Sequence, residues 1–227
     1  MVHPDSTIIK EKLIHKGAEA HLYYGSWFGK DVIFKHRIPK EYRNVELDKS
    51  IRMTRTLNEA RALISVKELG LNVPVVYDID TKEAVIIMKY IKGKILKKEL
   101  PNLNYEKKQM FFKELGKYIA ILHTNSHIHG DITTSNIIVT ENNDLFIIDF
   151  GLHSYSDKVE DKSVDIHLLK RVLISSHGND YKICYDAFLE GYQSGYKKEE
   201  INMSKQIIRN IKVIETRGRY IKREERL

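Results

Sequence analysis

The stretch that decides the fold reads His129-Gly130-Asp131-Ile132-Thr133-Thr134-Ser135-Asn136 and is followed, after a short interval, by Ile147-Ile148-Asp149-Phe150-Gly151. Asn136 lies five residues after Asp131, and Asp149 lies 13 residues after Asn136. Between them, two short apolar runs flank a polar turn, a pattern that is typical of a β-hairpin. Such a hairpin would bring Asp149 back beside Asn136.

These residue types at this spacing fit phosphoryl transfer. That reaction needs a carboxylate aimed at the acceptor hydroxyl and oxygen ligands that hold Mg²⁺ across the phosphates. Asp131 suits the catalytic role, and Asn136 and Asp149 suit the metal. We expect Gly151 to let the backbone turn sharply after Asp149, because glycine has no Cβ.

A candidate phosphate-binding lysine lies upstream. Lys35 ends an apolar run, and Glu59 follows 24 residues later, where apolar residues have helical spacing. A strand lysine can neutralise phosphates, and an ion pair with Glu59 would orient the Lys35 ammonium and keep it charged. Residues 15–20 join two expected strands and would cover the phosphates. Within this loop, the acidic Glu19 would face the phosphates unless a metal ion or backbone amides compensated its charge.

Hydrophobic patterning divides the chain into two parts. The first part consists of strands around one long helix, and the second is mainly helical. The expected strands are 7–14, 21–26, 31–36, 73–78, 84–90, 137–140 and 145–148, and the expected helices are 48–69, 105–124, 163–175, 181–195 and 198–216. The change near Gly93 predicts an N-lobe at 1–91 and a C-lobe at 92–227, and ligands favour the cleft between such lobes.

Taken in order, Lys35, Glu59, the H-G-D…N stretch and D-F-G resemble the motifs that protein kinases share. The resemblance implies an α+β, bilobal protein-kinase-like fold with a small β-rich N-lobe, one long helix and a reduced helical C-lobe. It also implies that ATP binds with Mg²⁺ between the lobes. The chain departs from ordinary kinases in its single loop glycine, Gly17, and in H-G-D, which Rio-like and aminoglycoside-kinase-like enzymes share. Only 14 residues separate Gly151 from Asp165, and no A-P-E motif appears.

Further stretches resemble the small kinase subunit of the KEOPS complex, the PRPK family. They are residues 17–20, 35–43, 52–60, 129–136 and 217–219, and the resemblance covers nearly the whole chain. It implies a compact Rio-like serine/threonine kinase that hydrolyses ATP and can phosphorylate itself. It further implies two partner subunits: a large threonylcarbamoyl-transferring ATPase subunit, which the kinase would regulate, and a small subunit on the N-lobe. The complex would form threonylcarbamoyladenosine on transfer RNA.

The resemblance also assigns roles to individual residues. Asp131, Lys35 and Glu59 would be catalytic, and Asn136 and Asp149 would bind the metal. The expected nucleotide contacts are Ile14, Lys16, Gly17, Ala18, Glu19, Ala20, Ile33, Lys35, Met88, Tyr90 and Ile91. The expected contacts to partners or RNA are Lys40, Arg43, Arg52, Arg55, Arg217 and Arg219, for which a solvated basic face is the alternative.

The composition is that of a globular protein. Of 227 residues, 42% are hydrophobic and 30% are charged, which excludes disorder along the whole chain. The formal net charge of +7 favours a polyanionic partner such as a nucleotide or RNA. The single cysteine, Cys184, excludes an intrachain disulfide, and no apolar run reaches the length of a membrane span. We therefore expect a cytoplasmic protein without membrane contact.

Other interpretations stay open. His123, His127 and His129 could form a zinc site, but helix-end packing and support of the catalytic loop are favoured. Asp165 is expected to anchor that loop by hydrogen bonds. An aminoglycoside-type small-molecule kinase shares H-G-D, but the short, basic C-terminal end disfavours it. A non-catalytic kinase-fold scaffold for proteins and RNA is disfavoured by the intact catalytic and metal-binding residues.

Overall fold

The computed structural model describes residues 8–224, with side chains for 8–217, and it divides into two compact units. The first unit ends at Lys92 but also includes Phe146–Gly151, and the second comprises Gly93–Leu145 and the chain from Leu152 onward. The sequence assigns residues 146–151 to the second lobe, whereas the structure places them with the first unit. One reason is local: the Ile147 amide donates a hydrogen bond to the Asn72 carbonyl, at 2.9 Å.

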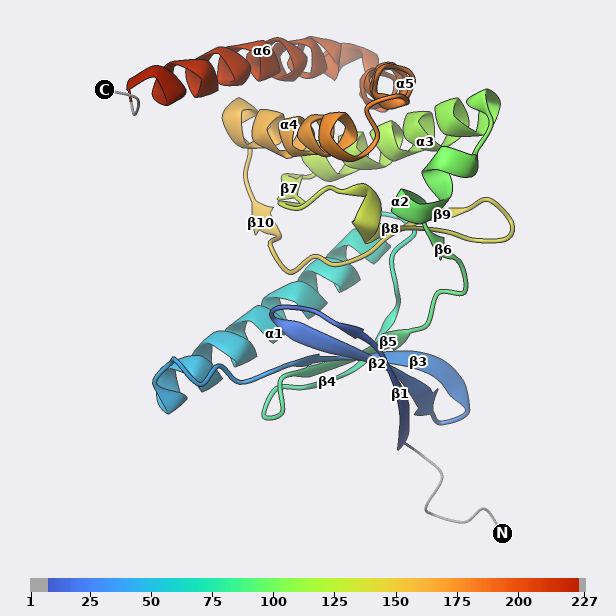
Figure 1. Cartoon of the computed structure of the whole chain (residues 1–227), viewed down its shortest axis with the longest axis vertical. Coiled ribbons are helices and arrows are strands. Elements are labelled where there is room, and N and C mark those ends of the chain that lie inside the picture. The colour runs from blue at the N-terminus through green and yellow to red at the C-terminus, as the bar shows by residue number, and fades with distance from the viewer. Residues whose placement is uncertain (1–7, 225–227) are drawn as a thin grey trace. The chain divides into compact units, whose positions relative to one another are not determined.

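The first unit is a five-stranded antiparallel sheet with one long helix (Figure 1). The sheet has the order β1-β2-β3-β5-β4. Its strands are β1 (Ile8–Lys16), β2 (Ala20–Trp27), β3 (Lys30–Arg37), β4 (Val76–Asp80) and β5 (Val85–Lys89), and the helix α1 is Val45–Glu68. This arrangement confirms the expected α+β class and the β-rich first half.

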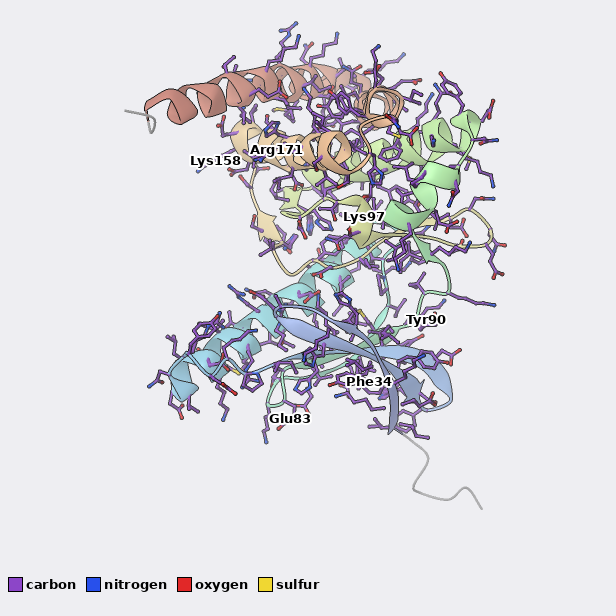
Figure 2. All side chains as sticks on the ribbon, in the orientation of Figure 1. Phe34, Glu83, Tyr90, Lys97, Lys158 and Arg171 are labelled. Atoms are coloured by element: carbon purple, nitrogen blue, oxygen red, sulfur yellow. The ribbon has the colours of Figure 1, made fainter. Side chains whose placement is uncertain are left out.

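A tight turn joins β2 to β3 and sets their register. Its two central residues, Phe28 and Gly29, have φ angles of 47° and 74°, which a type I′ hairpin turn requires. Along β3, side chains alternate between faces. Phe34, labelled in Figure 2, packs with Val32 and Ile87 in a buried cluster. Lys35, its neighbour in sequence, therefore points to the opposite face.

Helix α1 packs on β4 and β5, but not with the apolar stripe that the sequence suggests. Ala60 and Leu63 are buried as expected, whereas Ile64 is 43% exposed. Thr56 and Glu59 are buried instead. The side-chain oxygen of Asn44 accepts hydrogen bonds from the amides of the first turn, so α1 begins three residues earlier than expected.

The second unit is mainly helical. Its helices are α2 (Leu96–Glu99), α3 (Tyr105–Thr124), α4 (Val159–Ser176), α5 (Tyr181–Ser194) and α6 (Ile201–Glu224), with short 3₁₀ helices at Leu100–Asn102, Thr134–Asn136 and Lys198–Glu200. Its short strands are β6 (Lys94–Ile95), β7 (His127–Ile128), β8 (Ile137–Val139) and β10 (Ser154–Tyr155), and β9 (Leu145–Ile147) begins at Leu145 of this unit and continues into the Phe146–Gly151 segment of the first. The expected β8–β9 hairpin is present in a sheet of order β6-β8-β9, and β10 pairs with β7.

Close packing of α3 against α5 organises this unit. A Cβ atom added to Gly116 would lie 2.1 Å from the Phe188 carbonyl oxygen, and one added to Gly191 would lie 1.9 Å from that of Lys113. Both helix backbones can approach this closely only because glycine stands at the two positions. Helix α3 leads through β7 into the loop that contains Asp131, so this packing holds the helix from which the loop begins.

Candidate functional site

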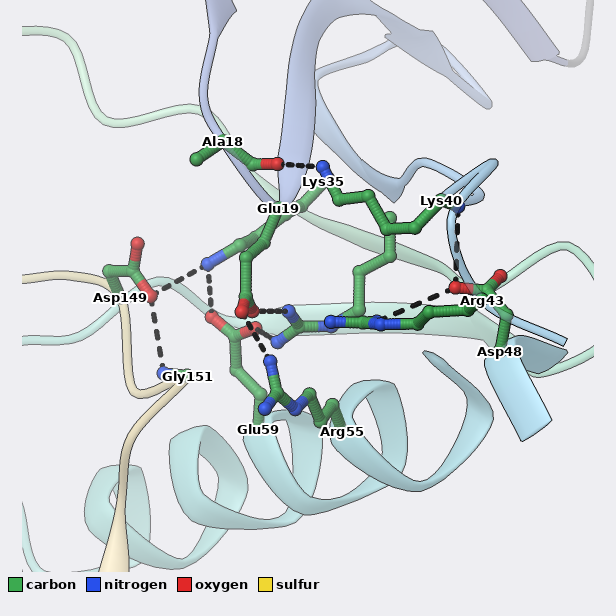
Figure 3. Close-up of polar contacts among 11 residues, drawn as sticks. Ala18, Glu19, Lys35, Lys40, Arg43, Asp48, Arg55, Glu59, Asp149 and Gly151 are labelled. Atoms are coloured by element: carbon green, nitrogen blue, oxygen red, sulfur yellow. Dashed lines mark hydrogen bonds and ion pairs between the residues drawn. The ribbon is translucent and has the colours of Figure 1, made fainter. Parts of the chain in front are cut away.

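Lys35 lies at the centre of a buried ion-pair cluster in the first unit (Figure 3). Its Nζ atom is 2.6 Å from Glu59 Oε1 and 2.8 Å from Asp149 Oδ1. The Lys35 and Glu59 side chains are 7% and 1% exposed. The predicted lysine–glutamate pair is therefore present, and a solvated Glu59 or a surface Lys35 is excluded.

Arg37 is a member of this cluster that the sequence analysis did not identify as a site residue. Its Nη2 atom lies 2.6 Å from Glu59 Oε2, so the two oxygens of Glu59 bind two different cations. Arg37 is only 4% exposed. Because side chains two residues apart share a strand face, the spacing from Lys35 to Arg37 was the signal that could have identified it.

The charges in this cluster stabilise one another. Burial by itself would lower the pKa of Lys35, but the carboxylates of Glu59 and Asp149 raise it above its usual value. The ammonium therefore stays charged across the physiological pH range. An ammonium held in this way on a strand can bind an anionic group that enters beside it.

Asp149 has an unusual backbone conformation. Its φ angle is 65°, in the left-handed region, whereas Gly151 has no positive φ. Gly151 and Leu152 form a turn directly after this residue, as expected, but the left-handed backbone conformation lies at Asp149 itself. Gly151 matters for a further reason: its amide donates a hydrogen bond to Asp149 Oδ1 at 3.1 Å, and a Cβ atom there would lie 3.0 Å from the same oxygen.

The loop between β1 and β2 closes on itself. The Gly17 amide donates to the Ala20 carbonyl at 3.0 Å, and a Cβ atom on Gly17 would lie 2.9 Å from that oxygen. Arg55 and Arg37 both pair with the Glu19 carboxylate, Arg37 at 3.4 Å. Lys40 donates to the Ala18 carbonyl. Arginines thus compensate the acidic loop residue, where the sequence suggested a metal ion or backbone amides.

The other expected nucleotide contacts have different exposures. Ile14 and Lys16 are exposed on β1, whereas Ile33 and Met88 are buried and lie opposite each other on β3 and β5. These two share the sheet face of Lys35, as an adenine-binding surface would require. Two further expected contacts follow the end of β5: Tyr90 is half-buried, and Ile91 is buried.

The expected partner contacts separate into two groups. Lys40, Arg43, Arg52 and Arg55 gather near the start of α1, where Asp48 pairs with Arg43 at 3.5 Å and with Arg52 at 2.6 Å. Arg217 on α6 pairs with Glu160 at 3.1 Å. The Arg219 side chain lies outside the described residues.

The second unit carries the expected catalytic loop. The Asn136 amide nitrogen donates to the Asp131 carbonyl and to Asp131 Oδ2, both at 2.9 Å. This orientation leaves the Asn136 amide oxygen for a cation. Asp149 belongs to the first unit, and its side chain is 47% exposed, so its carboxylate is also accessible to a cation. Carboxylate and amide oxygens are both ligands that Mg²⁺ accepts, so each residue by itself fits the expected role.

Asp165 anchors this loop, as the sequence predicts. Its carboxylate accepts hydrogen bonds from the amides of His129 at 3.0 Å and Gly130 at 2.8 Å. His123 Nε2 lies 3.2 Å from the same carboxylate, and its Nδ1 lies 2.8 Å from the Tyr192 hydroxyl. Burial alone would raise the pKa of Asp165, but His123, His129 and the Gly130 amide lower it.

His127 and His153 form a second polar contact beside the loop. His127 Nδ1 lies 2.9 Å from His153 Nε2, and the Tyr155 ring packs against both. Burial, followed by repulsion from His127 and His129, lowers the pKa of His153 from 6.5 to about 4, although Asp165 opposes the shift. Among the side chains of residues 8–217, no group of three or more His, Cys, Asp or Glu could hold a metal ion.

Comparisons with known proteins agree with this geometry. Residues 30–164 match the RIO domain family. A KEOPS complex subunit, Bud32, of Pyrococcus abyssi is 40% identical over 218 residues, which cover 93% of this chain and 97% of that protein.

A probable bifunctional tRNA threonylcarbamoyladenosine biosynthesis protein of Methanococcus maripaludis strain C6 is 42% identical over 216 residues. A protein of the same description from Methanocaldococcus jannaschii is 41% identical over 214 residues. The alignments cover 95% and 94% of this chain but 38% of each relative, so the chain spans little more than a third of these longer proteins.

We predict that Glu59→Gln destabilises the protein by about 3 kcal/mol, because two buried cations would lose their shared carboxylate. The free energy of unfolding, measured by urea denaturation, tests this. Glu68→Gln, an exposed carboxylate on the same helix, is the matched control and should change it by less than about 0.5 kcal/mol. Equal effects of the two substitutions would contradict the role of the cluster.

A second prediction concerns pH. The unfolded chain accepts a proton on His153 near pH 6.5, whereas the folded protein accepts it only near pH 4. Stability that His153 contributes at neutral pH is therefore lost as the pH falls from about 6.5 to about 4. Melting temperatures across this window should fall less steeply in His153→Gln than in the wild type. Parallel curves for the two proteins would show that His153 is not the group responsible.

Proposed function

Because the chain belongs to the RIO-domain family and is 40% identical to a KEOPS complex subunit of Pyrococcus abyssi, we propose that it is the kinase-like subunit of a KEOPS-type complex. In this role it binds ATP with Mg²⁺ and takes part in forming threonylcarbamoyladenosine on transfer RNA. The observation that carries the proposal is the buried Lys35–Glu59 pair with Asp149 on the same ammonium.

The first unit supplies the phosphate-binding groups. Lys35 presents a permanently charged ammonium, and Glu59 orients it from α1. Electrostatic stabilisation of the phosphoryl oxygens is the main task of the protein in this reaction. A neutral or mobile side chain at position 35 would not perform it.

The second unit supplies the groups that act on the acceptor. Asp131 orients a water molecule or a Ser/Thr hydroxyl and accepts its proton. Asn136 holds the Asp131 side chain in place by a hydrogen bond at 2.9 Å. Asp149 and Asn136 would ligate Mg²⁺, which neutralises charge on the phosphates when it is bound.

The printed names of the relatives support the proposal of a partner subunit. One relative is named as a subunit of a complex, and others are named as bifunctional proteins of tRNA threonylcarbamoyladenosine biosynthesis. We propose that this chain works with a threonylcarbamoyl-transferring ATPase subunit and regulates it. A small N-lobe subunit and transfer RNA complete the proposed assembly.

The proposed location is the cytoplasm. Within the described part of the chain, none of the helices combines the length and apolar character needed to cross a bilayer. The cytoplasm is where a protein that acts on transfer RNA would meet its substrate, and location in intact cells stays a prediction.

Turnover of ATP tests the catalytic part of the proposal. Lys35→Ala and Asp131→Ala should each lower ATP hydrolysis and self-phosphorylation by at least about a hundredfold, because they remove the phosphate-binding charge and the proton acceptor. Asp186→Asn, at an exposed carboxylate on α5, should leave both rates unchanged. Wild-type rates in both alanine variants would refute this mechanism and favour a non-catalytic scaffold.

Capture of the tagged chain from its native cells tests the assembly. We expect transfer RNA and a protein of the threonylcarbamoyl-transferring ATPase type to copurify, and both should be identified by sequencing and mass spectrometry. Phosphate transfer to an aminoglycoside at ordinary enzymatic rates, with neither partner recovered, would instead favour the small-molecule kinase.

A further inference from the structure

A basic pocket lies beside the β1–β2 loop, within the first unit. Its cavity volume is only about 10 Å³, and the surrounding hollow is open to solvent, so the Glu19 carboxylate must move before a larger anion can enter. The residues that line it come from the loop, the end of β3 and the first half of α1: Glu19, Arg37, Ile38, Lys40, Arg43, Ile51, Arg52 and Arg55. Five of these side chains are cationic and one is a carboxylate, so the pocket concentrates positive charge.

The nearby carboxylates do not balance this charge. Glu19 pairs with Arg55 and Arg37, and Asp48 pairs with Arg43 and Arg52. The Lys40 ammonium donates to the Ala18 carbonyl. With Glu59, which binds Arg37, the neighbouring carboxylates number three against the five cations of the lining, so the pocket keeps an excess of positive charge. Like charges gathered in this way repel one another, and an anion of higher charge than a carboxylate relieves that repulsion.

Arg37 makes the pocket rigid on its inner side. Its Nη2 atom is bound to Glu59, and its side chain is 4% exposed. The Arg37 Nε atom is buried and has no hydrogen-bond partner among the described residues. A buried donor without an acceptor is costly, so an oxygen atom brought to this position would be bound favourably.

The ion pairs that hold the Glu19 carboxylate in the basic pocket are weak. Its side chain is 48% exposed, in contrast to the buried Arg37. A hydrogen bond from Arg55 is the main cause of its lowered pKa, and Arg55, Arg37 and Arg43 add favourable charge. Exposed ion pairs of this kind contribute little to stability, so a competing anion can displace the carboxylate.

We propose that this basic pocket binds a phosphate group and that Glu19 occupies the place of that group when none is bound. A phosphate carries about −1.5 to −2 charges at pH 7 and three acceptor oxygens, which match several arginines better than one carboxylate does. Its binding releases Glu19 and with it the loop that holds Gly17 and Ala18. The pocket is a second anion site, separate from the Lys35 ammonium.

Titration with inorganic phosphate at constant ionic strength tests this, with calorimetry for affinity and NMR of the 17–20 amides for location. Wild-type protein should bind saturably. Glu19→Gln should bind about tenfold more tightly, because the competing charge is gone. In that background, Arg55→Gln should weaken binding at least about tenfold, and it cannot act by breaking the Glu19 pair.

Arg61→Gln is the matched control, since it removes one exposed arginine from the same helix outside the pocket. It should leave phosphate affinity unchanged. Circular dichroism of each variant shows that the fold is retained. Equal affinities in Glu19→Gln and Glu19→Gln/Arg55→Gln would overturn the proposal.

The source of the phosphate group is resolved by comparing inorganic phosphate with ribose 5-phosphate. Similar affinities identify a phosphate ester as an acceptable ligand, and a preference for the inorganic ion identifies free phosphate. Binding of a hexaglutamate peptide without binding of either phosphate would refute the proposal in favour of an acidic protein segment.

The proposal is independent of the nucleotide function. Lys35→Ala should abolish ATP turnover but keep phosphate binding at the basic pocket. Loss of phosphate binding in Lys35→Ala, together with insensitivity to Arg55→Gln, would place the anion at the nucleotide site and overturn the second site.

Discussion

One buried carboxylate organises the first unit. Glu59 is 1% exposed and binds Lys35 and Arg37 through its two oxygens. A charge taken out of water must be paired, and Glu59 is the buried partner that both cations of β3 share, whereas Asp149 and Glu19, their other partners, are about half exposed. The position of α1 against the sheet is therefore set by charge pairing as well as by its buried apolar side chains, Ala60 and Leu63.

The same network links the loop to Asp149. Arg55 pairs with Glu19, Arg37 joins Glu19 to Glu59, and Lys35 joins Glu59 to Asp149. A loop with a single glycine can thus be held by side chains, where a glycine-rich loop would rely on its backbone. A change of charge at the outer end of this chain of contacts alters the partners of the inner residues.

In the second unit, too, a buried carboxylate has several hydrogen-bond donors, and here two of them are backbone amides. Asp165 is 1% exposed and stays ionised because two backbone amides and His123 donate to it. This anchor holds the loop that carries Asp131, while the close approach of α3 to α5 holds the helices beneath it. In both units, a buried carboxylate with several donors positions the functional side chains.

The sequence by itself determined the long elements and the motif residues. The 3.6-residue spacing over Tyr105–Thr124 predicted α3 with the observed bounds, and the order of Lys35, Glu59, Asp131 and Asn136 identified the kinase-like fold. Strands of two residues, such as β7 and β10, are too short to show any period. Only the tertiary structure placed Arg37 on Glu59 and two arginines on Glu19, because ion pairs between distant residues leave no local pattern in a sequence.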